Sequence, residues 1–216
     1  MSWERGDVPG PTPSMGEGLA EPPRLPADRF LPPGQRPVVE APVMHYGPVP
    51  RPRPERWRFT VGGATADGAE HAFTYEEVLA LPRLEVVADL HCATGWSSVD
   101  ETWAGVTARA VVDLVPPRTD VEHVLVFAEY GYAATVRLED LVSPRAVLAT
   151  HRDGAELSAE RGGPMRLIVP HLYSWKGPKW LRGWNYLTDV ERGFWEERGY
   201  HLRGDAWREE RYSYQE

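Results

Sequence analysis

The placement of proline most constrains what this chain can fold into. Fourteen of its 21 prolines lie among the first 54 of its 216 residues. Proline fixes φ and lacks a backbone N–H, so a segment such as PPRLPADRFLPPGQRP cannot form a helix or a central strand. We therefore expect residues 1–25 to be a disordered Pro- and Gly-rich tail, and residues 26–54 to be extended chain laid across a domain. That domain, 26–216, includes its own C-terminal arm.

The single cysteine and the formal charge of −8 exclude several classes of protein. A disulfide framework, a zinc finger and a thiolate-held iron–sulfur cluster each need several cysteines. Nucleic-acid binders normally present a basic face, which an acidic chain does not favour. No apolar run reaches the roughly 18 residues of a membrane span, and MSWERGDVPGPTP does not resemble a secretory signal. We expect a cytoplasmic protein that binds neither nucleic acid nor membrane.

Short apolar or alternating runs, separated by turn residues, fill the chain from Trp57 onward. Thr74 and Glu77 form a capping box that opens a short helix, and Thr107 could cap a second one. After Cys92, the sequence HCATGWSSVDETWAGV predicts a loop. Many short strands and two brief helices indicate an α+β fold, mostly β, with a mixed sheet. The expected strands are 57–63, 84–92, 123–129, 133–138, 146–151, 165–170 and 184–190, and the expected helices are 75–81 and 108–115.

Cys92 is the first residue that could carry chemistry. The chain has no GxGxxG, GxxxxGK[ST], HExxH or GxSxG motif, so dinucleotide, P-loop, zincin and α/β-hydrolase sites are not indicated. A lone cysteine is often a small buried hydrophobe, but this one follows a strand, where reactive groups are often placed. As a nucleophile it would need His91, His45 or His171 as its base. As a metal ligand, one thiolate could hold a metal that an organic cofactor already chelates.

A second candidate site lies in RGGPMRLIVPHLYSWKGPKWLRGW, residues 161–184. The only two lysines, Lys176 and Lys179, lie in this segment, and a Gly-Gly-Pro turn places Arg166 at the start of a strand. Arginine, lysine and backbone N–H groups that converge from two loops can form an anion pocket. The alternative is that these cations are ordinary surface charges beside the sheet.

Two further segments are rich in aromatic residues. Between prolines in APVMHYGPVP, His45 and Tyr46 could contact a ligand or simply pack. Residues 171–216 hold 11 aromatic residues, eight Lys or Arg and eight Asp or Glu. Their zero net charge argues against binding of single-stranded nucleic acid, which combines aromatic stacking with a basic groove. We expect an arm whose aromatic side chains cover the domain and whose charges pair at the surface.

From about Pro42 onward, these segments together resemble the molybdopterin-dependent oxidoreductases of the sulfite oxidase fold, especially the small bacterial members. The resemblance rests on the order and spacing of HYGPVP, HCATGW, W-x-G-V at 103–106, GGPMRLIVP and KGPKWLRG. It implies a single domain of that fold, a Mo-molybdopterin cofactor, and molybdenum bound by the thiolate of Cys92. The cofactor contacts that it implies are His45, Tyr46, Arg161, Arg166, Gly177, Pro178 and Lys179.

Differences from the family bear on the substrate. In sulfite oxidases an arginine stands where this chain has Met44, and another follows the cysteine, where this chain has Thr94-Gly95-Trp96. Arg161 stands where family members usually have His or Asn. The resemblance therefore implies oxygen-atom or two-electron transfer at a Mo-oxo centre. A small molecule other than sulfite would be the substrate, and a separate protein would donate or accept the electrons.

The length and the N-terminal sequence give two further expectations. Neither a haem domain nor an immunoglobulin-like dimerisation domain fits into 216 residues, so we expect a monomer. The twin-arginine signal of exported family members is not visible, which favours the cytoplasm. Two rival hypotheses stay open: a hydrolase or transferase with Cys92 as nucleophile, and a non-catalytic module that binds an anionic ligand.

Overall fold

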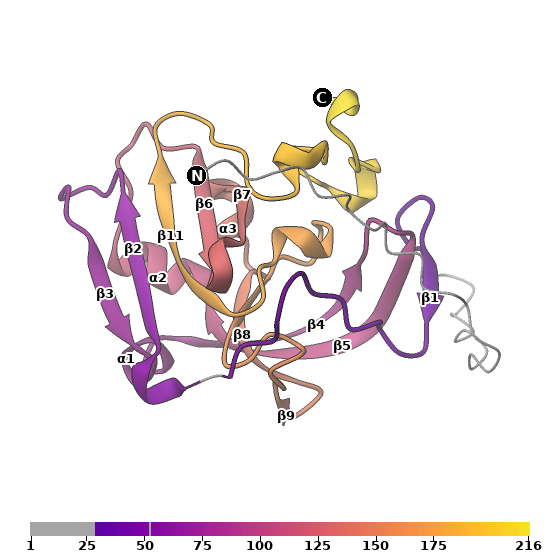
Figure 1. Ribbon diagram of the computed structural model, residues 1–216, viewed down its shortest axis with the longest axis horizontal. Coiled ribbons are helices and arrows are strands. Elements are labelled where there is room, and N and C mark those ends of the chain that lie inside the picture. The colour runs from indigo at the N-terminus through magenta and orange to yellow at the C-terminus, as the bar shows by residue number, and fades with distance from the viewer. Residues whose placement is uncertain (1–28, 52) are drawn as a thin grey trace.

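The computed structural model describes residues 29–51 and 53–216. Two β-sheets make up most of this part of the chain, and short helices lie at their ends (Figure 1). The predicted α+β, mostly β fold with mixed sheets is confirmed. The predicted tail, 1–25, lies outside the described residues.

The first sheet has six strands and is built around the long strand β5. β4 pairs with it along nearly its whole length in antiparallel register, and β1 pairs parallel to its first residues. β8 is antiparallel to the last residues of β5, and β9 and β10 both pair with β8. The strands are β1 (Arg36–Val38), β4 (Arg83–His91), β5 (Trp96–Thr107), β8 (Val147–Arg152), β9 (Ala155–Glu156) and β10 (Arg166–Ile168).

The second sheet has five strands in the order β3-β2-β11-β6-β7. Its central strand, β11, is parallel to β2 and antiparallel to β6, which makes the sheet mixed. β6 and β7 form the predicted hairpin around Tyr130 and Gly131. The strands are β2 (Arg58–Gly63), β3 (His71–Thr74), β6 (His123–Ala128), β7 (Ala133–Arg137) and β11 (Leu181–Leu187).

The helices are short. Thr74 and Glu77 form the predicted capping box, because Thr74 Oγ1 accepts from Glu77 N at 3.2 Å and Glu77 Oε2 accepts from Thr74 N at 2.7 Å. Thr107 stands at the N-cap of the second helix, but its side chain makes no capping hydrogen bond, so that part of the prediction is wrong. The helices are α1 (Tyr75–Leu79), α2 (Ala108–Leu114) and α3 (Leu138–Leu141), and 3₁₀ turns include η1 (Pro54–Arg56) and η3 (Ser174–Lys176).

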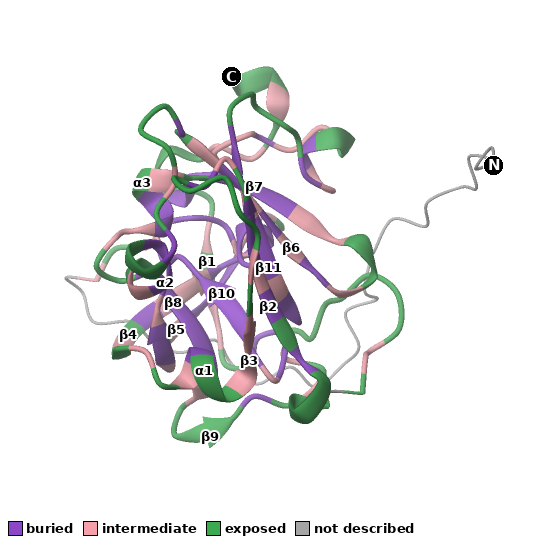
Figure 2. Cartoon of the chain, turned by 90° about the vertical axis from the view of Figure 1, so that its left-hand side faces the viewer, coloured by how far each residue is buried: buried purple, intermediate pink, exposed green. Residues whose placement is uncertain are grey.

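The main hydrophobic core lies between the two sheets and takes in α2. Phe59 of β2 meets Trp184 of β11 edge to face, with ring centroids 5.0 Å apart. Leu148 and Leu167 of the first sheet are fully buried in the same cluster. Figure 2 shows the buried residues concentrated along the strands of both sheets. Aromatic and aliphatic burial on this scale is the main source of stability in such a domain.

One predicted loop is a strand. The segment after Cys92 forms a turn of only a few residues and then β5, the longest strand described. Its alternation is hidden in the sequence because the side chains of Ser97 and Glu101 are polar yet buried, and each has a polar partner: Ser97 Oγ contacts His91 Nδ1 and Glu101 pairs with Arg152. Buried polar side chains are stable only when they are hydrogen-bonded, as here. Strands β1 and β3 were also not predicted.

Both flanking segments lie against the domain. We name residues 29–51 the N-terminal strap and residues 188–216 the C-terminal arm. The strap is extended as predicted, and β1 is part of it. In the arm, Tyr200 packs on Trp195 at 5.2 Å, and Arg192 pairs with Glu216. Three other aromatic residues of the arm, Trp207, Tyr212 and Tyr214, are exposed, so only part of its aromatic surface covers the domain. Within the described residues, no helix has the length and apolar character needed to cross a bilayer.

Candidate cofactor-binding site

Cys92 lies in the tight turn between β4 and β5. The turn is closed by two backbone hydrogen bonds, from Cys92 N to Trp96 O at 2.8 Å and from Gly95 N to Cys92 O at 3.0 Å. The Cys92 side chain is buried, and its Sγ lies 3.1 Å from Thr94 Oγ1. A hydroxyl at this distance can donate to a thiolate and stabilise it. The turn therefore presents the sulfur at a strand end with one local donor.

The three histidines considered as bases for Cys92 are engaged elsewhere. His91 is the strand neighbour of Cys92, so its ring projects to the opposite face of the sheet, where Nδ1 contacts Ser97 Oγ at 2.8 Å. Burial lowers the pKa of His91 to about 4. His171 Nε2 pairs with Asp140 Oδ1 at 2.7 Å, and His45 Nδ1 contacts Gly47 O at 3.0 Å. Within the described part of the chain, no imidazole hydrogen-bonds to the thiol, so a cysteine–histidine pair is not formed.

Arg166 and Lys179 form the centre of a basic cluster with Arg161. Arg166 is buried at the start of β10, and it donates to Arg161 O at 3.2 Å and Gly177 O at 3.4 Å. Lys179 Nζ donates to Met44 O at 2.7 Å and to Glu160 O at 2.8 Å. Both cations therefore have neutral carbonyl oxygens as their hydrogen-bond acceptors, and the Nε atom of Arg166 is buried without a partner.

The electrostatics of this cluster favour an anion. Burial and, to a lesser extent, the nearby charges of Arg166 and Arg161 together lower the pKa of Lys179 to about 7. Burial also lowers the pKa of Arg166 to about 10, against the raising effect of Glu101. Like charges that depress one another's pKa are relieved by a negative group placed between them. Arg166 is buried and so is not a solvated surface charge, and we call the cluster of Arg161, Arg166 and Lys179 the anion pocket.

Glycines let the two loops of the pocket approach each other. A Cβ on Gly177 would lie 2.3 Å from Leu167 O, and one on Gly162 would lie 2.9 Å from Lys179 Cγ. Gly162 also has φ +107°, which only glycine adopts without strain. Next to it, Pro178 O accepts the backbone hydrogen bond of Leu167 at 3.1 Å, which fixes the loop to β10. The Gly-Gly-Pro and Lys-Gly-Pro segments are thus required by close packing.

The strap carries His45 and Tyr46 to the same region. The His45 ring lies 6.0 Å from that of Trp180, the residue after Lys179, and the Tyr46 ring lies 5.0 Å from that of Phe194. Tyr46 is 65% exposed, so it covers the site rather than filling the core. The structure therefore places the strap beside the anion pocket.

Ala41 of the strap connects the pocket to the Cys92 turn. Its side chain packs in the small cluster that contains Cys92 and Trp96. Its carbonyl oxygen accepts from Arg161 Nη1 at 3.1 Å. The thiol and the basic cluster thus contact the same residue of the strap from two sides.

Lys176 does not belong to this pocket, contrary to the sequence-based interpretation. Its side chain is fully buried and pairs with Glu196 at 2.6 Å. η3 turns it away from Lys179 into the interface with the arm, where it also donates to Thr135 O at 2.6 Å. A buried cation with a carboxylate partner is a structural element. His171, paired with Asp140, is likewise structural.

Comparison with known proteins decides the family. A model of the oxidoreductase molybdopterin binding domain matches residues 46–195, well over half of the chain. The chain belongs to this family. It is therefore an oxidoreductase with a molybdopterin-binding domain, and the resemblance described from the sequence is confirmed.

Relatives within and near the family differ in length. The chain is 36% identical over 187 residues to the uncharacterized oxidoreductase YuiH of Bacillus subtilis (strain 168), covering 85% of this chain and 92% of that one. It is 23% identical over 160 residues to the protein-methionine-sulfoxide reductase catalytic subunit MsrP of Pseudomonas syringae pv. tomato, covering 66% of this chain and 47% of MsrP. The chain thus spans about half the length of MsrP.

A solved structure shares the fold. The sulfane dehydrogenase SoxCD from Paracoccus pantotrophus superposes with a TM-score of 0.60 at 18% identity, over 67% of this chain and 41% of that chain. At that identity the likeness concerns the fold alone. It agrees with the sulfite oxidase fold that the sequence motifs imply.

A group of buried residues behind the pocket was missed by the sequence reasoning. Two guanidinium groups lie over the Trp103 ring, with Arg152 Cζ 5.8 Å and Arg166 Cζ 5.5 Å from its centroid. Arg152 pairs with Glu101 at 2.7 Å, and burial raises the pKa of Glu101. Glu101 and Trp103 would have been visible as alternate positions of a strand had 96–107 been recognised as one. Buried polar atoms without a partner here are Glu101 Oε2, Trp103 Nε1, Arg152 Nε and Arg166 Nε.

These observations fit the molybdopterin cofactor of the family. The cofactor ends in a phosphate, and Arg166 and Lys179 offer charge-assisted donors that neutral carbonyls satisfy poorly. The unpartnered Nε of Arg166 adds a further donor at the same place. One thiolate, Cys92, suits a metal already chelated by an organic ligand. The residues present therefore fit the group.

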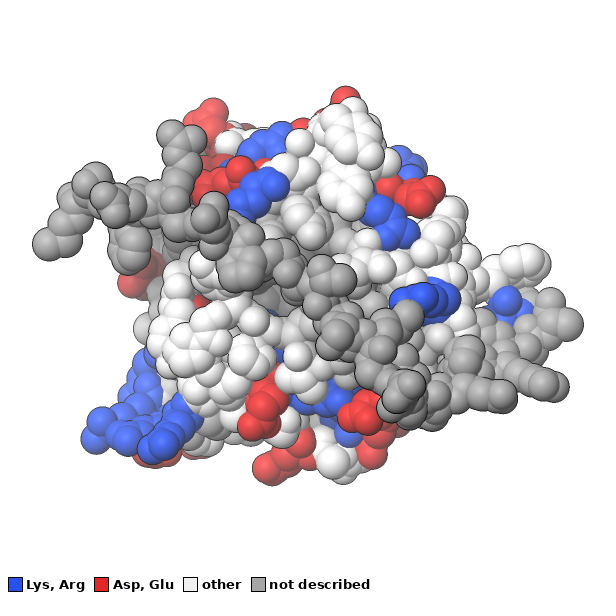
Figure 3. Space-filling view, turned by 45° about the vertical axis from the view of Figure 1, so that its right-hand side comes forward, with Lys and Arg blue, Asp and Glu red and all other residues white. Residues whose placement is uncertain are grey.

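A cleft of about 210 Å³ opens beside the pocket. Trp180, the residue after Lys179, lines the cleft, and four of the other nine lining residues are arginines. The run RPRPERWR signals this concentration of positive charge in the sequence. Figure 3 shows basic side chains spread over the molecule, with one dense group at its lower left. The lining residues are Pro50, Arg51, Arg53, Arg56, Trp57, Glu129, Gly163, Pro164, Trp180 and Arg182.

Proposed function

We propose that this oxidoreductase binds Mo-molybdopterin with its phosphate end at Arg166 and Lys179 and with Cys92 as the protein ligand of molybdenum. The observation that carries this proposal is the pair of cations at the pocket. Arg166 is buried and Lys179 is partly buried, yet their hydrogen-bond acceptors are carbonyl oxygens. Such a pair is expected to bind a phosphate strongly.

The other residues have supporting roles in this proposal. Gly177 and Pro178 shape the loop that brings Lys179 to the phosphate, since a side chain at Gly177 would meet Leu167 O. His45 and Tyr46 cover the cofactor from the strap. Arg161 holds the strap through Ala41 O and adds positive charge to the pocket.

The bound cofactor would supply two-electron redox chemistry, while the protein supplies binding, orientation and electrostatics. Cys92 contributes a soft anionic sulfur, and Thr94 Oγ1 donates toward it at 3.1 Å. The turn excludes water from this sulfur on one side, because Trp96 and Ala41 pack against Cys92. These contacts orient the thiolate at the end of β4.

For the substrate class, we propose a neutral oxygen-atom donor such as a sulfoxide. The residues next to the thiol, Thr94 and Trp96, are uncharged, as is Met44 of the strap, so no arginine stands where sulfite oxidases hold their anion. A relative that covers two thirds of the chain is named a protein-methionine-sulfoxide reductase. Reduction of a sulfoxide consumes two electrons and two protons and yields a thioether and water. A reduced electron-transfer protein would supply the electrons.

The first experiment is metal and pterin analysis of the full chain, purified from a host that makes the cofactor. We expect molybdenum approaching one atom per chain and a pterin released on denaturation. Reduced protein should then be reoxidised by methionine sulfoxide faster than oxidised protein is reduced by sulfite. Stoichiometric zinc without molybdenum, or metal-free protein from a loading host, contradicts the proposal. Cytoplasmic location and a monomeric state stay predictions.

A further inference from the structure

The turn that carries Cys92 is held by side chains from outside the matched domain, 46–195. Gln35 of the strap donates its Nε2 to Cys92 O at 3.0 Å. Its Oε1 accepts from Ser97 Oγ at 3.0 Å, and Ser97 Oγ in turn contacts His91 Nδ1. Because Ser97 gives its only proton to Gln35, the imidazole nitrogen is the donor of that last bond. The amide of Gln35 is thereby fixed at both ends.

Arg211 of the arm holds the next residue of the turn. Its Nη1 donates to Ala93 O, and its Nη2 donates to Pro33 O of the strap at 3.1 Å. The guanidinium also lies over the ring of Tyr173, 5.1 Å from the centroid. One side chain therefore joins the arm, the strap and the Cys92 turn. A planar fork with several fixed donors suits this task, which a lysine would perform less completely.

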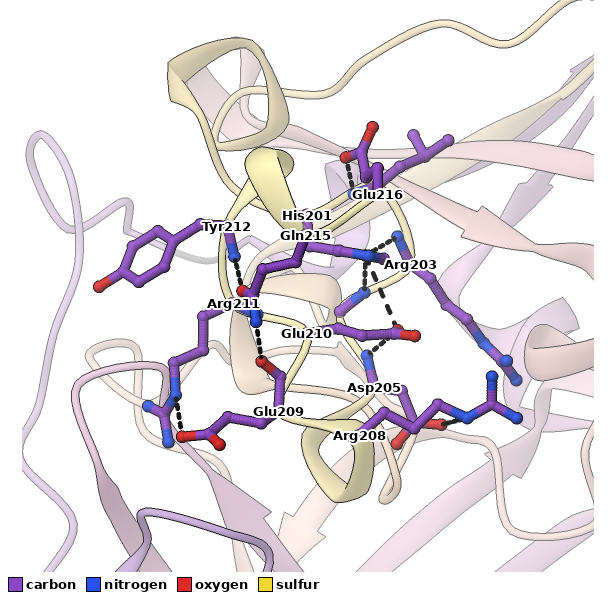
Figure 4. Close-up of polar contacts among 12 residues, drawn as sticks. His201, Arg203, Asp205, Arg208, Glu209, Glu210, Arg211, Tyr212, Gln215 and Glu216 are labelled. Atoms are coloured by element: carbon purple, nitrogen blue, oxygen red, sulfur yellow. Dashed lines mark hydrogen bonds and ion pairs between the residues drawn. The ribbon is translucent and has the colours of Figure 1, made fainter.

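The arm holds Arg211 itself in a defined position. Its backbone N–H and that of Tyr212 both donate to Gln215 Oε1, at 2.9 and 2.7 Å (Figure 4). Its Nε lies 3.6 Å from Glu209 Oε1, and the two side chains lie side by side in Figure 4. The Arg211 side chain is only 12% exposed. Its position is therefore set by the fold rather than by solvent.

The far end of the turn is held as well. The backbone N–H of Arg36 donates to Gly95 O at 3.0 Å, where β1 begins to pair with β5. Gly95 has φ +93°, and a Cβ on it would lie 3.1 Å from Gly34 O. The strap thus passes so close to the turn that a side chain at this position would be strained and crowded.

We propose that Gln35 and Arg211 are positioning residues that fix the direction of the Cys92 thiolate by holding the carbonyl groups of Cys92 and Ala93. The inference rests on the proposed role of Cys92 as a molybdenum ligand. Hydrogen bonds around a ligating side chain orient it and tune the metal, and their loss impairs the site even when the ligand is retained. The flanking segments are therefore part of the metal site although the domain match excludes them.

The single cysteine makes a direct test possible on full-length protein purified without cofactor. Gln35→Glu keeps the size of the side chain but replaces the amide donor to Cys92 O with an acceptor. Arg211→Met removes the fork, and Arg211→Lys restores part of it. We expect Cys92 in Gln35→Glu and Arg211→Met to react with iodoacetamide about fivefold faster than in the parent, counted by intact mass. Fivefold corresponds to about 1 kcal/mol of local opening, close to the value of one hydrogen bond.

Arg208→Met is the matched control. Arg208 lies in the same arm, is 66% exposed, and its Nε is 3.8 Å from its partner Asp205. This variant should react at the parental rate, and Arg211→Lys should fall between the parent and Arg211→Met. Parental alkylation rates in both Gln35→Glu and Arg211→Met would overturn the proposal. If Arg211→Met fails to fold, as far-UV circular dichroism would show, the near-isosteric Gln35→Glu and Arg211→Lys still decide it.

Loaded protein separates this inference from the proposed function. In Gln35→Glu and Arg211→Lys, the sulfur-to-metal charge-transfer band should shift while the molybdenum content stays near the parental value. Cys92→Ser tests the ligand role itself. A parental visible spectrum in loaded Cys92→Ser overturns the ligand role, whatever the alkylation result. A different result is that the charge-transfer band disappears in Cys92→Ser while Gln35→Glu and the Arg211 variants keep parental spectra and alkylation rates. That result supports the ligand role of Cys92 and overturns the positioning role of Gln35 and Arg211.

Discussion

Lys176 Nζ lies 2.6 Å from Glu196 Oε1, and neither side chain is exposed to solvent. Glu196 Oε1 also accepts from Thr135 N at 2.9 Å, and Lys176 Nζ also donates to Leu202 O. The pair therefore joins η3 and β7 to the C-terminal arm. Burial lowers the pKa of Lys176, while the charge of Glu196 opposes this shift and favours the ion pair.

Removing one partner of this pair should destabilise the fold. We expect Lys176→Met to lower the free energy of unfolding by about 3–5 kcal/mol, because Glu196 would stay buried without its cation. The double variant Lys176→Met/Glu196→Gln should recover part of the loss, since no unpaired charge remains. Urea unfolding followed by circular dichroism measures both. A loss below about 1 kcal/mol in the single variant would show that solvent reaches the pair.

Lys179 should make anion binding depend on pH. Its pKa is about 7 in the folded protein without cofactor and near 10.5 when exposed, so an anion must recharge it above pH 7. Sulfate is a suitable probe, because its own charge does not change in this range. Its affinity should fall by up to about tenfold per pH unit above pH 7 and level off below it. Calorimetric titration from pH 6 to 9 measures this, and Lys179→Met should remove the dependence.

Lys179 should also make the stability of the cofactor-free protein rise with pH. The folded pKa is depressed, so the unfolded chain binds more protons between pH 7 and 10.5. The unfavourable contribution of Lys179 is therefore fully present below pH 7 and is relieved as the pH rises through that window. Relative to Lys179→Met, the melting temperature of the parent should rise with pH. If the melting temperature of the parent instead falls relative to Lys179→Met as the pH rises, the burial of the Lys179 amine is contradicted.

Arg166 and Lys179 should control cofactor retention. Each lost charge-assisted hydrogen bond costs roughly 1.5–3 kcal/mol, which is about tenfold or more in affinity. We expect Arg166→Met/Lys179→Met to be purified with much less pterin than the parent, measured per chain after denaturation. Arg137→Met is the control, because Arg137 is exposed and pairs only with Glu139 at 3.2 Å. Unchanged pterin content in the double variant would show that neither cation binds the cofactor.

Cys92→Ser should separate metal chemistry from cofactor binding. Because the proposal assigns the phosphate end to Arg166 and Lys179, most of the pterin should remain in the variant. Turnover should be lost, since the sulfur sets the electron density of the metal. Pterin content, visible absorption and sulfoxide reduction are the measurements. Full activity in Cys92→Ser would leave the thiol as a buried structural residue.

Gly177 should tolerate no side chain. A Cβ would lie 2.3 Å from Leu167 O, a backbone atom that cannot move without shifting β10. We expect Gly177→Ala to cost about 1–3 kcal/mol and to reduce pterin content, because Arg166 donates to Gly177 O. At Gly62 a Cβ would meet only side-chain atoms of Asn185 and Glu70, so Gly62→Ala should be milder. Equal thermal stability of the two variants would contradict this account.

Much of the fold could be predicted because its strands are short apolar runs between turn residues. The capping box at Thr74 and the hairpin at Tyr130 depend only on neighbouring residues, and both are confirmed. β5 could not be predicted, since its buried face includes Ser97 and Glu101, whose partners are distant in sequence. Local patterns do not show which polar residue will have a buried partner.

The candidate site was likewise predicted only in part from the sequence. The sequence motifs identified the segments of Arg166 and Lys179, and the structure brings them together. The motifs gave no reason to separate Lys176 from Lys179. The direction of a side chain in a 3₁₀ turn depends on what packs against it, which the local sequence does not show. Gln35 and Arg211 were not singled out, since they carry no motif and act through single contacts with a turn far away in the chain.

The hydrogen bond between Arg211 and Ala93 spans 118 positions of sequence, which has a consequence for biosynthesis. During translation, the strap and the Cys92 turn are made long before Arg211. Segments fold as their residues become available, so the Cys92 turn forms before the arm can hold it. Under the proposed role of Cys92 as a molybdenum ligand, its sulfur would take its final direction only once the arm has docked.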